Sequence, residues 1–410
     1  MSAPRAVAIV GGGQGGCEVA AALRAGGHDG PLTMICEEPG LPYERPPLSK
    51  ALLTGALAPE QILLRPASFF REREVELVEG RAVRIDRERR RVELGDGSAL
   101  PYDHLVLATG ARNRPLQVPG ADLDGVLALR TLPDALELRE RLAQAQAVAI
   151  IGAGFIGLEV ATAAANGHRD VTVLESAERP MTRTTCAATA AFFSSRHEER
   201  GVAFNFNAAA VALTGNRGRV RAVEDADGRH HPAELALIAI GILPNDELAA
   251  AAGLPVDRGV LVDAQLRTAD PAISAIGDCA RFPSPLWSTP VLLESVQNAS
   301  DQAHAVAARL LGHGQAPYAA VPWFWSDQAG VRLQLAGRTA DAEEVVLSGD
   351  PAGGRFSALC FSDGRLHGVE SVGRPGDHVA ARRLLASRTD LSPAAAAAAG
   401  FDLKAYARAA

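Results

Sequence analysis

Residues 6–16 read AVAIVGGGQGG, and residues 147–157 read AVAIIGAGFIG. In each stretch a short apolar run ends in closely spaced glycines, and an alanine-rich segment follows. Apolar runs bounded by glycine are typical of buried strands, and the segments that follow are typical of helices. Both stretches therefore predict the strand–turn–helix unit of a doubly wound α/β domain.

An acidic residue follows each glycine-rich turn, at the end of a second apolar run. Glu37 and Glu175 stand about 20 residues beyond the last glycine of their turns. An acid at this distance accepts hydrogen bonds from a ribose diol, while the glycines let the backbone and the helix N-terminus approach a pyrophosphate. Two such units in one chain predict two bound dinucleotides.

The rest of the chain fits a split arrangement of these units. Strand-like runs at 103–110 and 235–241 close the first and the second unit, and 273–278 returns to the first. From about Val321 the sequence alternates with turn signals between the runs, which is typical of antiparallel strands. The alternating runs are 331–336, 344–347, 356–361 and 366–372. We predict two Rossmann-like α/β domains and a C-terminal α+β domain with an antiparallel sheet.

Composition excludes several classes of protein. The net charge of −7 argues against a nucleic-acid partner, and the longest apolar run, 235–243, is too short for a membrane span. No signal peptide is visible. Five cysteines are scattered without metal-ligand spacing, which favours a reducing compartment and argues against a disulfide scaffold, a zinc site or an iron–sulfur cluster. We expect a cytoplasmic protein with no metal and no membrane partner.

Seven segments carry a family likeness. In chain order they are LPYERPPLSK (41–50), LVLATG (105–110), GAGFIGLEV (152–160), GILPN (241–245), AIGDCARF (275–282), LESVQN (293–298) and PWFWSDQ (322–328). In this order they resemble the FAD-dependent, NADH-using ferredoxin reductases of bacterial oxygenase systems, over nearly the whole chain. The resemblance implies a glutathione-reductase-like fold, with an FAD domain at 1–112 and 242–320, an NADH domain at 113–241 and a C-terminal domain at 321–410.

The resemblance also implies which residues hold FAD. Gly11, Gly13, Gly15 and Gly16 would face the pyrophosphate, with Glu37 at the adenosine ribose and Val83 by the adenine. The flavin side would be lined by Arg45, Pro47, Lys50, Thr109 and Gly110, with Arg130 as a further contact, Gly277 and Asp278 at the ribityl chain, and Glu294, Ser295 and Val296 at the pyrimidine edge. Trp323 or Trp325 would touch the flavin, although aromatic residues are more often core. Asp278 could also serve as a helix N-cap, and both roles can hold at once.

The NADH residues implied by the resemblance are Gly152, Gly154, Ile156, Gly157, Glu159, Glu175 and Gly241. A carboxylate at Glu175 accepts both ribose hydroxyls of NADH and repels the 2′-phosphate of NADPH. Arg179 and Arg183 follow closely, so NADPH is not excluded.

Lys50 and Glu159 are the predicted catalytic residues. Only Lys50 and Lys404 are lysine among 41 basic residues, and Pro46-Pro47 restricts the approach of Lys50. The alternative is an ordinary surface lysine. An ammonium near flavin N5, paired with Glu159, would stabilise the charge that arrives with a hydride.

No cysteine pair follows the first glycine-rich unit, which argues against a thiol relay. Electrons would therefore pass singly from flavin to a [2Fe–2S] ferredoxin, which would serve a cytochrome P450 or a ring-hydroxylating dioxygenase. The alternatives are an NADH oxidase or peroxidase and a redox-sensing protein like apoptosis-inducing factor. Because ferredoxins are typically acidic, we expect a basic patch near the flavin edge. The basic run Arg87, Arg89, Arg90 and Arg91 is either a solvated face or a part of such docking.

Overall fold

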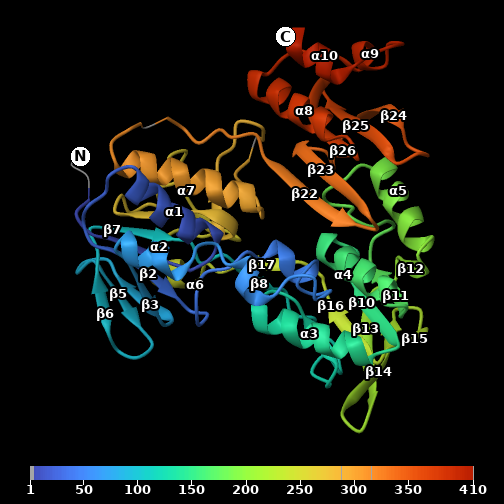
Figure 1. Ribbon diagram of the computed structural model, residues 1–410, viewed down its shortest axis with the longest axis horizontal. Helices are drawn as coiled ribbons and strands as arrows, with labels where there is room; N and C mark the ends of the chain where they lie inside the picture. Colours follow the sequence, from blue (N-terminus) through green and yellow to red (C-terminus); the bar gives the residue numbers. More distant parts are fainter. Residues whose placement is uncertain (1–3, 288, 315, 410) are drawn as a thin grey trace. The chain divides into compact units, whose positions relative to one another are not determined.

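The computed structural model describes residues 4–287, 289–314 and 316–409 and groups the chain into two compact units (Figure 1). Three segments form each unit: unit 1 comprises Met1–Glu44, Glu60–Arg112 and Leu243–Pro322, and unit 2 comprises Arg45–Pro59, Asn113–Ile242 and Trp323–Ala410. Unit 2 thus contains both the expected NADH domain and the expected C-terminal domain. The division into three domains with the bounds given above remains a prediction.

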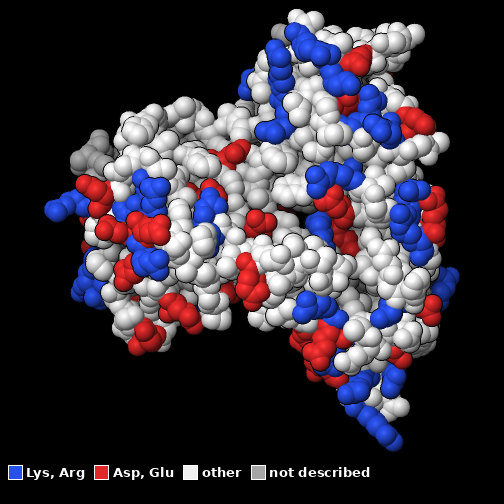
Figure 2. All heavy atoms as spheres, viewed as in Figure 1, with Lys and Arg blue, Asp and Glu red and all other residues white. Residues whose placement is uncertain are grey.

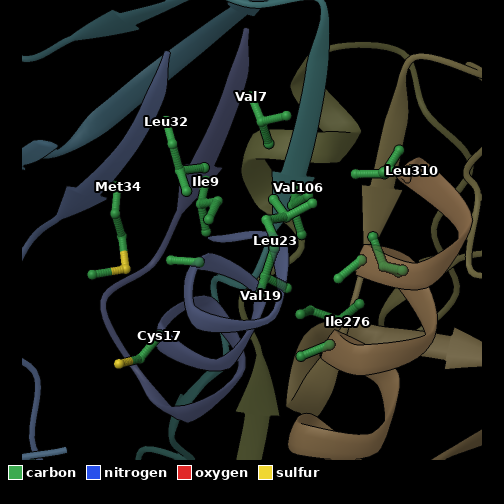
Figure 3. Close-up of a cluster of buried hydrophobic side chains, with 14 of the residues drawn as sticks. Val7, Ile9, Cys17, Val19, Leu23, Leu32, Met34, Val106, Ile276 and Leu310 are labelled. Atoms are coloured by element: carbon green, nitrogen blue, oxygen red, sulfur yellow. The ribbon is translucent and has the colours of Figure 1, made fainter. Parts of the chain in front are cut away.

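Unit 1 is built on a five-stranded parallel sheet. Its strand order is β19 (Ile273–Ala275), β7 (His104–Leu107), β1 (Val7–Val10), β2 (Leu32–Cys36) and β3 (Val75–Glu79). Two helices, α1 (Gln14–Ala25) and α7 (Val296–Leu310), pack together and share an apolar core with the sheet. Figure 3 shows this core, in which Val7, Ile9 and Val106 face Leu23 of α1. Apolar burial on both sides explains why these strands are continuously hydrophobic.

Unit 2 contains a second parallel sheet. Its order is β12 (Val202–Phe206), β11 (Asp170–Glu175), β10 (Ala147–Ile151), β16 (Leu235–Ile238) and β9 (Val126–Ala128). The helices of this part are α3 (Leu132–Gln144), α4 (Phe155–Asn166) and α5 (Ala187–Glu198), whereas α6 (Glu247–Ala251) belongs to unit 1. An antiparallel ribbon follows, made of β13 (Ala210–Asn216), β14 (Arg219–Asp225) and β15 (His230–Pro232).

The C-terminal part of unit 2 is a five-stranded antiparallel sheet. Its order is β22 (Trp323–Gln328), β23 (Val331–Gly337), β26 (Arg365–Val372), β25 (Arg355–Ser362) and β24 (Glu344–Asp350), accompanied by α8 (Pro375–Ser387), α9 (Pro393–Ala396) and α10 (Leu403–Ala409). The four predicted alternating runs are all strands. The prediction omitted β22, whose Trp-Phe-Trp start lacks alternation. The predicted fold class, two parallel α/β parts with a C-terminal antiparallel sheet, is confirmed.

The remaining elements are short. They are η1 (Pro46–Ser49), η2 (Pro59–Ile62), α2 (Ala67–Glu72), β4 (Ala82–Asp86), β5 (Arg91–Leu94), β6 (Ala99–Pro101), β8 (Ala111–Asn113), β17 (Ile242–Pro244), β18 (Val260–Leu261), η3 (Gly277–Cys279), β20 (Ala280–Phe282) and β21 (Val291–Leu292). Within the described ranges, no helix has the length and apolar character needed to cross a bilayer.

Candidate functional site: two dinucleotide cradles and a buried lysine–glutamate pair

Three predicted FAD residues meet at one edge of the unit 1 sheet. Gly11 follows β1, Thr109 lies just beyond β7 and Gly277 just beyond β19, and these three strands are neighbours in the sheet. The strand order changes direction at β1, because β2 lies on one side of it and β7 on the other. In open α/β sheets the carboxyl ends of the strands at such a switch point are where ligands bind.

The first glycine-rich turn is shaped by two close backbone approaches. Gly11 has φ of +120°, and a Cβ placed on it would lie 2.1 Å from the carbonyl oxygen of Ala108. A Cβ on Gly16 would lie 2.0 Å from the carbonyl oxygen of Gly11. Gly13 is different, since a Cβ there would meet no described atom within 4 Å. Gly13 is also the N-cap of α1, and no described side chain caps that helix. The open backbone amides fit the pyrophosphate of a dinucleotide.

Substitutions at these two glycines are expected to separate folding from FAD retention. Gly16→Ala should unfold at a lower temperature even without flavin, because its Cβ collides with backbone. Gly13→Ala should keep the unfolding temperature of the apoprotein but lose FAD, because its methyl group occupies space that only a ligand needs. The measurements are thermal unfolding of the apoproteins and the flavin-to-protein absorbance ratio. Full FAD retention by Gly13→Ala would contradict this assignment of the cradle.

The predicted adenosine side of unit 1 is exposed. The Glu37 side chain is 68% exposed and lies 3.5 Å from the Arg81 guanidinium. Val83 of β4 is 50% exposed, an unusual state for a valine. An exposed carboxylate and an exposed apolar side chain suit a ribose and an adenine, and both assignments stay predictions.

The other predicted FAD residues of unit 1 are held by local hydrogen bonds. The Thr109 hydroxyl donates to the Asn245 carbonyl over 2.6 Å, and the Asn245 amide donates back to the Thr109 carbonyl over 2.9 Å. The amide of Gly277 donates to the buried Gln302 over 2.7 Å. Ser295 is the N-cap of α7, so Glu294 and Val296 flank a helix start. The N-cap of η3 is Ile276 and Asp278 lies within η3, so the expected N-cap role of Asp278 is wrong, and its contact with FAD stays a prediction.

The second glycine-rich turn repeats the geometry of the first. Gly152 has φ of +107°, a Cβ on it would lie 2.4 Å from the Ala239 carbonyl oxygen, and a Cβ on Gly154 would meet no described atom within 4 Å. Glu175, at the end of β11, accepts hydrogen bonds from the amide of Ala153 over 2.7 Å and from the amide of Ala177 over 2.9 Å. The carboxylate is thereby fixed beside the turn, where a ribose that follows the pyrophosphate would lie.

The predicted Lys50–Glu159 pair is formed in unit 2. Lys50 Nζ lies 2.8 Å from Glu159 Oε1, and the Glu159 side chain is only 4% exposed, whereas Lys50 is 22% exposed. The Ser49 hydroxyl donates to Glu159 Oε2 over 2.5 Å, and the Ser326 hydroxyl donates to Oε1 over 2.6 Å. Three donors thus compensate the negative charge of the buried Glu159 carboxylate, while the Lys50 side chain stays partly exposed to solvent.

A hydrogen-bonded chain continues from this pair into the C-terminal sheet. Ser326 accepts from the Gln328 amide over 3.3 Å, and Gln328 Oε1 lies 3.1 Å from His197 Nε2. All three side chains are buried. Burial lowers the pKa of His197 to about 4, so the imidazole is neutral at pH 7. Sequence reasoning missed these residues, although Ser326 and Gln328 have the i, i+2 spacing that places them on one face of a strand.

Ser326→Ala is expected to slow the reduction of bound flavin by NADH about tenfold and to shift its pH profile, because Glu159 loses one charge-assisted hydrogen bond. Ser326→Thr retains a hydroxyl and should restore most of the rate. Ser357→Ala, at a buried serine that bonds Asp377 instead, is the matched control for a mere loss of stability. If Ser326→Ala and the unaltered protein have the same pH profile, the Ser326 hydroxyl does not assist Glu159 in flavin reduction.

Several predicted flavin-side residues lie in unit 2 beside the NADH residues. The Arg45 guanidinium donates to the Arg130 carbonyl over 2.5 Å, so these two predicted FAD contacts lie together. Pro47 belongs to η1, next to Lys50. Trp323 and Trp325 are half-buried with ring centroids 5.7 Å apart, and the Arg382 guanidinium lies 4.7 Å from the Trp323 ring centroid. The contacts of these residues with FAD stay predictions.

The arginine run after β4 is mostly paired with acids. Arg87 lies 2.8 Å from Asp270, Arg89 lies 3.1 Å from Asp86, and Arg91 lies 3.4 Å from Glu93. This pairing favours the solvated-face interpretation over a docking role.

The thiols of unit 1 are unsuited to electron relay. Burial raises the pKa of Cys17 to about 12 and that of Cys36 to about 11, and burial also raises the pKa of Cys279. All three stay protonated at neutral pH, and the thiolate is the reactive form. This disfavours the NADH oxidase or peroxidase alternative, which needs a reactive cysteine.

Comparison with known proteins places the chain in a family. The family model described as "Pyridine nucleotide-disulphide oxidoreductase" matches residues 5–303, and the model "Reductase C-terminal" matches residues 323–407. The chain belongs to the pyridine nucleotide-disulphide oxidoreductases. It is 48% identical to rhodocoxin reductase of Rhodococcus erythropolis, with 97% of this chain and 93% of the relative aligned, and 38% identical to putidaredoxin reductase of Pseudomonas putida, with 96% and 94% aligned.

Solved structures agree with these relatives. The ferredoxin reductase of the CYP199A2 system from Rhodopseudomonas palustris superposes with a TM-score of 0.96 at 45% identity, covering 98% of this chain and 100% of that one. The reductase in the covalent putidaredoxin reductase–putidaredoxin complex gives 0.95 at 37% identity, with both chains fully covered. The predicted kinship with ferredoxin reductases of bacterial oxygenase systems is confirmed, and the chain is an oxidoreductase of that family.

Proposed function

We propose that this protein is an FAD-dependent NADH:ferredoxin reductase that works in the cytoplasm. The observation that carries the proposal is the presence of two open glycine-rich cradles, at Gly13 and Gly154, in one chain whose full-length relatives are reductases of electron-carrier proteins. Two cradles match one flavin dinucleotide and one nicotinamide dinucleotide. The five free cysteines are consistent with a reducing compartment.

The residues present fit both dinucleotides. The unit 1 cradle, with Glu37, Thr109 and Asp278, would hold FAD, and the unit 2 cradle, with Glu175, would hold NADH. Bound FAD supplies the capacity to take up two electrons as a hydride and to release them one at a time.

The chain itself contributes a positioned charge. Glu159 is fixed by Ser49 and Ser326 and holds the Lys50 ammonium in one orientation. A fixed ammonium stabilises negative charge that develops next to it more than mobile water does, because no reorganisation is needed during the reaction.

The electron acceptor is a [2Fe–2S] ferredoxin, and a cytochrome P450 or a ring-hydroxylating dioxygenase receives electrons only through it. Relatives support both kinds of terminal oxygenase. One relative is the ferredoxin reductase of the CYP199A2 system, and another, 42% identical, is the reductase component of the anthranilate 1,2-dioxygenase system of Burkholderia cepacia. Exposed Arg382, Arg383 and Arg388 gather at α8 of the C-terminal domain, where Figure 2 shows a group of basic side chains. These arginines would attract an acidic ferredoxin despite the net charge of −7.

Reduction of the ferredoxin is expected to slow as ionic strength rises. Salt screens the attraction between the α8 arginines and an acidic partner, so the second-order rate constant should fall about tenfold or more between 50 mM and 500 mM salt. Arg382→Glu with Arg383→Glu should lower the low-salt rate and flatten this dependence. If the rate constant changes neither with salt nor with these substitutions, the α8 arginines are not the docking surface.

The test of the function is an NADH-dependent cytochrome c assay on the purified flavoprotein. Fast reduction only after a [2Fe–2S] ferredoxin is added supports the proposal. Fast NADH oxidation with oxygen or peroxide as sole acceptor supports the oxidase alternative. Slow turnover with a long-lived charge-transfer complex supports a redox-sensing role. Purified protein that binds no flavin would refute all three.

A further inference from the structure

A second cluster of potential ligand side chains belongs to unit 2 and shares no residue with either cradle. Cys186 is the N-cap of α5, Cys360 lies in β25 and Glu370 lies in the neighbouring β26. One ligand atom from each residue lies within 4.8 Å of the other two, and all three residues are buried. We propose that Cys186, Cys360 and Glu370 bind a thiophilic divalent metal ion, with Zn²⁺ as the best chemical fit, which links α5 to the C-terminal sheet.

The register of the sheet places two of these ligands on one face. Glu370 pairs with Ala358, and Cys360 stands two residues beyond Ala358 on the same strand. Side chains two apart on a strand share a face, so Cys360 and Glu370 point to the same side. Cys186 packs against that side together with Ala358 and Cys360. Two strands and a helix start therefore supply the three ligands, and strands and helices hold ligands more rigidly than loops do.

The hydrogen bonds of Glu370 orient it for this role. Oε1 accepts from the Cys186 amide over 2.7 Å, and Oε2 lies 3.3 Å from the Cys186 sulfur. One carboxylate oxygen is thus engaged by backbone while the other faces sulfur, an arrangement that fixes a ligating carboxylate. Ligands of tetrahedral zinc stand about 3.3–3.8 Å apart, so these residues need to contract by only about 1 Å. The Thr189 hydroxyl lies 3.6 Å from the Cys186 sulfur.

The filled site would carry little net charge. Glu370 is 0% exposed, and no Lys, Arg or His among residues 4–287, 289–314 and 316–409 forms an ion pair with it. Burial without a counter-charge favours the protonated carboxyl group, so a bound metal ion would displace that proton. Two thiolates and one carboxylate around Zn²⁺ leave a single net negative charge, which the positive N-terminus of α5 favours.

Metal analysis of the full-length flavoprotein, expressed without a polyhistidine tag in zinc-supplemented cells, tests the site. We expect about one zinc per chain by mass spectrometry, at least about tenfold less in Cys360→Ser and in Glu370→Gln, and an unchanged content in the control Cys17→Ala. Cys17 is also buried, but lies in unit 1. Zinc that stays in Cys360→Ser and Glu370→Gln would overturn the proposal.

Cadmium provides a test that needs no variant to fold. Protein stripped by a chelator should show the ultraviolet thiolate-to-cadmium absorption on titration with Cd²⁺, saturating at about one equivalent and displaced by Zn²⁺. The chelator alone should lower the unfolding temperature, and Zn²⁺ should restore it. Absence of a saturable band, or a Cys186–Cys360 disulfide in freshly purified protein, would refute the site. These readouts do not depend on ferredoxin reduction.

Discussion

Lys50→Met is expected to slow the reduction of bound flavin by NADH about 10²–10³-fold, the loss found when one preorganised electrostatic group is removed from an active site. The substitution keeps the length of the side chain and removes its charge. It also leaves Glu159 buried without its cation, so Glu159→Gln in the same chain should recover part of the rate. Stopped-flow measurement of the flavin absorbance under anaerobic conditions reports this step directly.

Lys404 is the natural control, because it is the second of only two lysines and is exposed on α10. Lys404→Met should reduce flavin at the unaltered rate and retain FAD equally well. If Lys50→Met also reduces flavin at that rate, the Lys50–Glu159 pair is a structural ion pair and has no part in hydride transfer.

Glu175→Arg is expected to reverse the preference for the nicotinamide cofactor. The carboxylate accepts hydrogen bonds from the Ala153 and Ala177 amides beside the unit 2 cradle. It would also accept hydrogen bonds from the ribose diol of NADH. Hydrogen bonds to a charged group contribute about 1.5–3 kcal/mol, so kcat/KM for NADH should fall about 10–100-fold. Arginine at this position would pair with the 2′-phosphate of NADPH, so kcat/KM for NADPH should rise.

Glu175→Gln separates the two contributions of this side chain. It keeps one of the two acceptor oxygens, so either the Ala153 or the Ala177 amide loses its acceptor, and it removes the charge that repels a phosphate. NADH use should therefore fall, but less than in Glu175→Arg, while NADPH use should rise modestly. Steady-state kinetics with each cofactor provide the comparison. Equal use of NADH and NADPH by the unaltered protein would refute the specificity assigned to Glu175.

The cradles were predictable because their chemistry is local. Gly11 and Gly16 are five residues apart, and their conformations follow from a strand that must turn at once into a helix. The same holds for Gly152 and Gly157. Alternation likewise predicted β23 to β26, since it reports a sheet with two different faces. The resemblance added roles for residues such as Lys50 and Glu159, whose pairing the structure then displays at 2.8 Å.

The surroundings of that pair were not predictable in the same way. Ser326 lies 167 positions from Glu159, and Cys186 lies 184 positions from Glu370. Serine and cysteine have no spacing signal when one partner belongs to a helix and the other to a strand far away in the sequence. The expectation of no zinc site rested on such spacing, which detects only ligands that are neighbours along the chain.

From its sequence alone, this protein is determined to have two dinucleotide-binding βαβ units and an antiparallel C-terminal sheet, because hydrophobic period and glycine placement act within about 20 residues of chain. Only the tertiary structure decided which side chains share a buried space: Ser49 and Ser326 on Glu159, or two cysteines beside Glu370. The physical reason is that burying a charge requires partners wherever packing brings them, and packing joins segments that sequence order keeps apart.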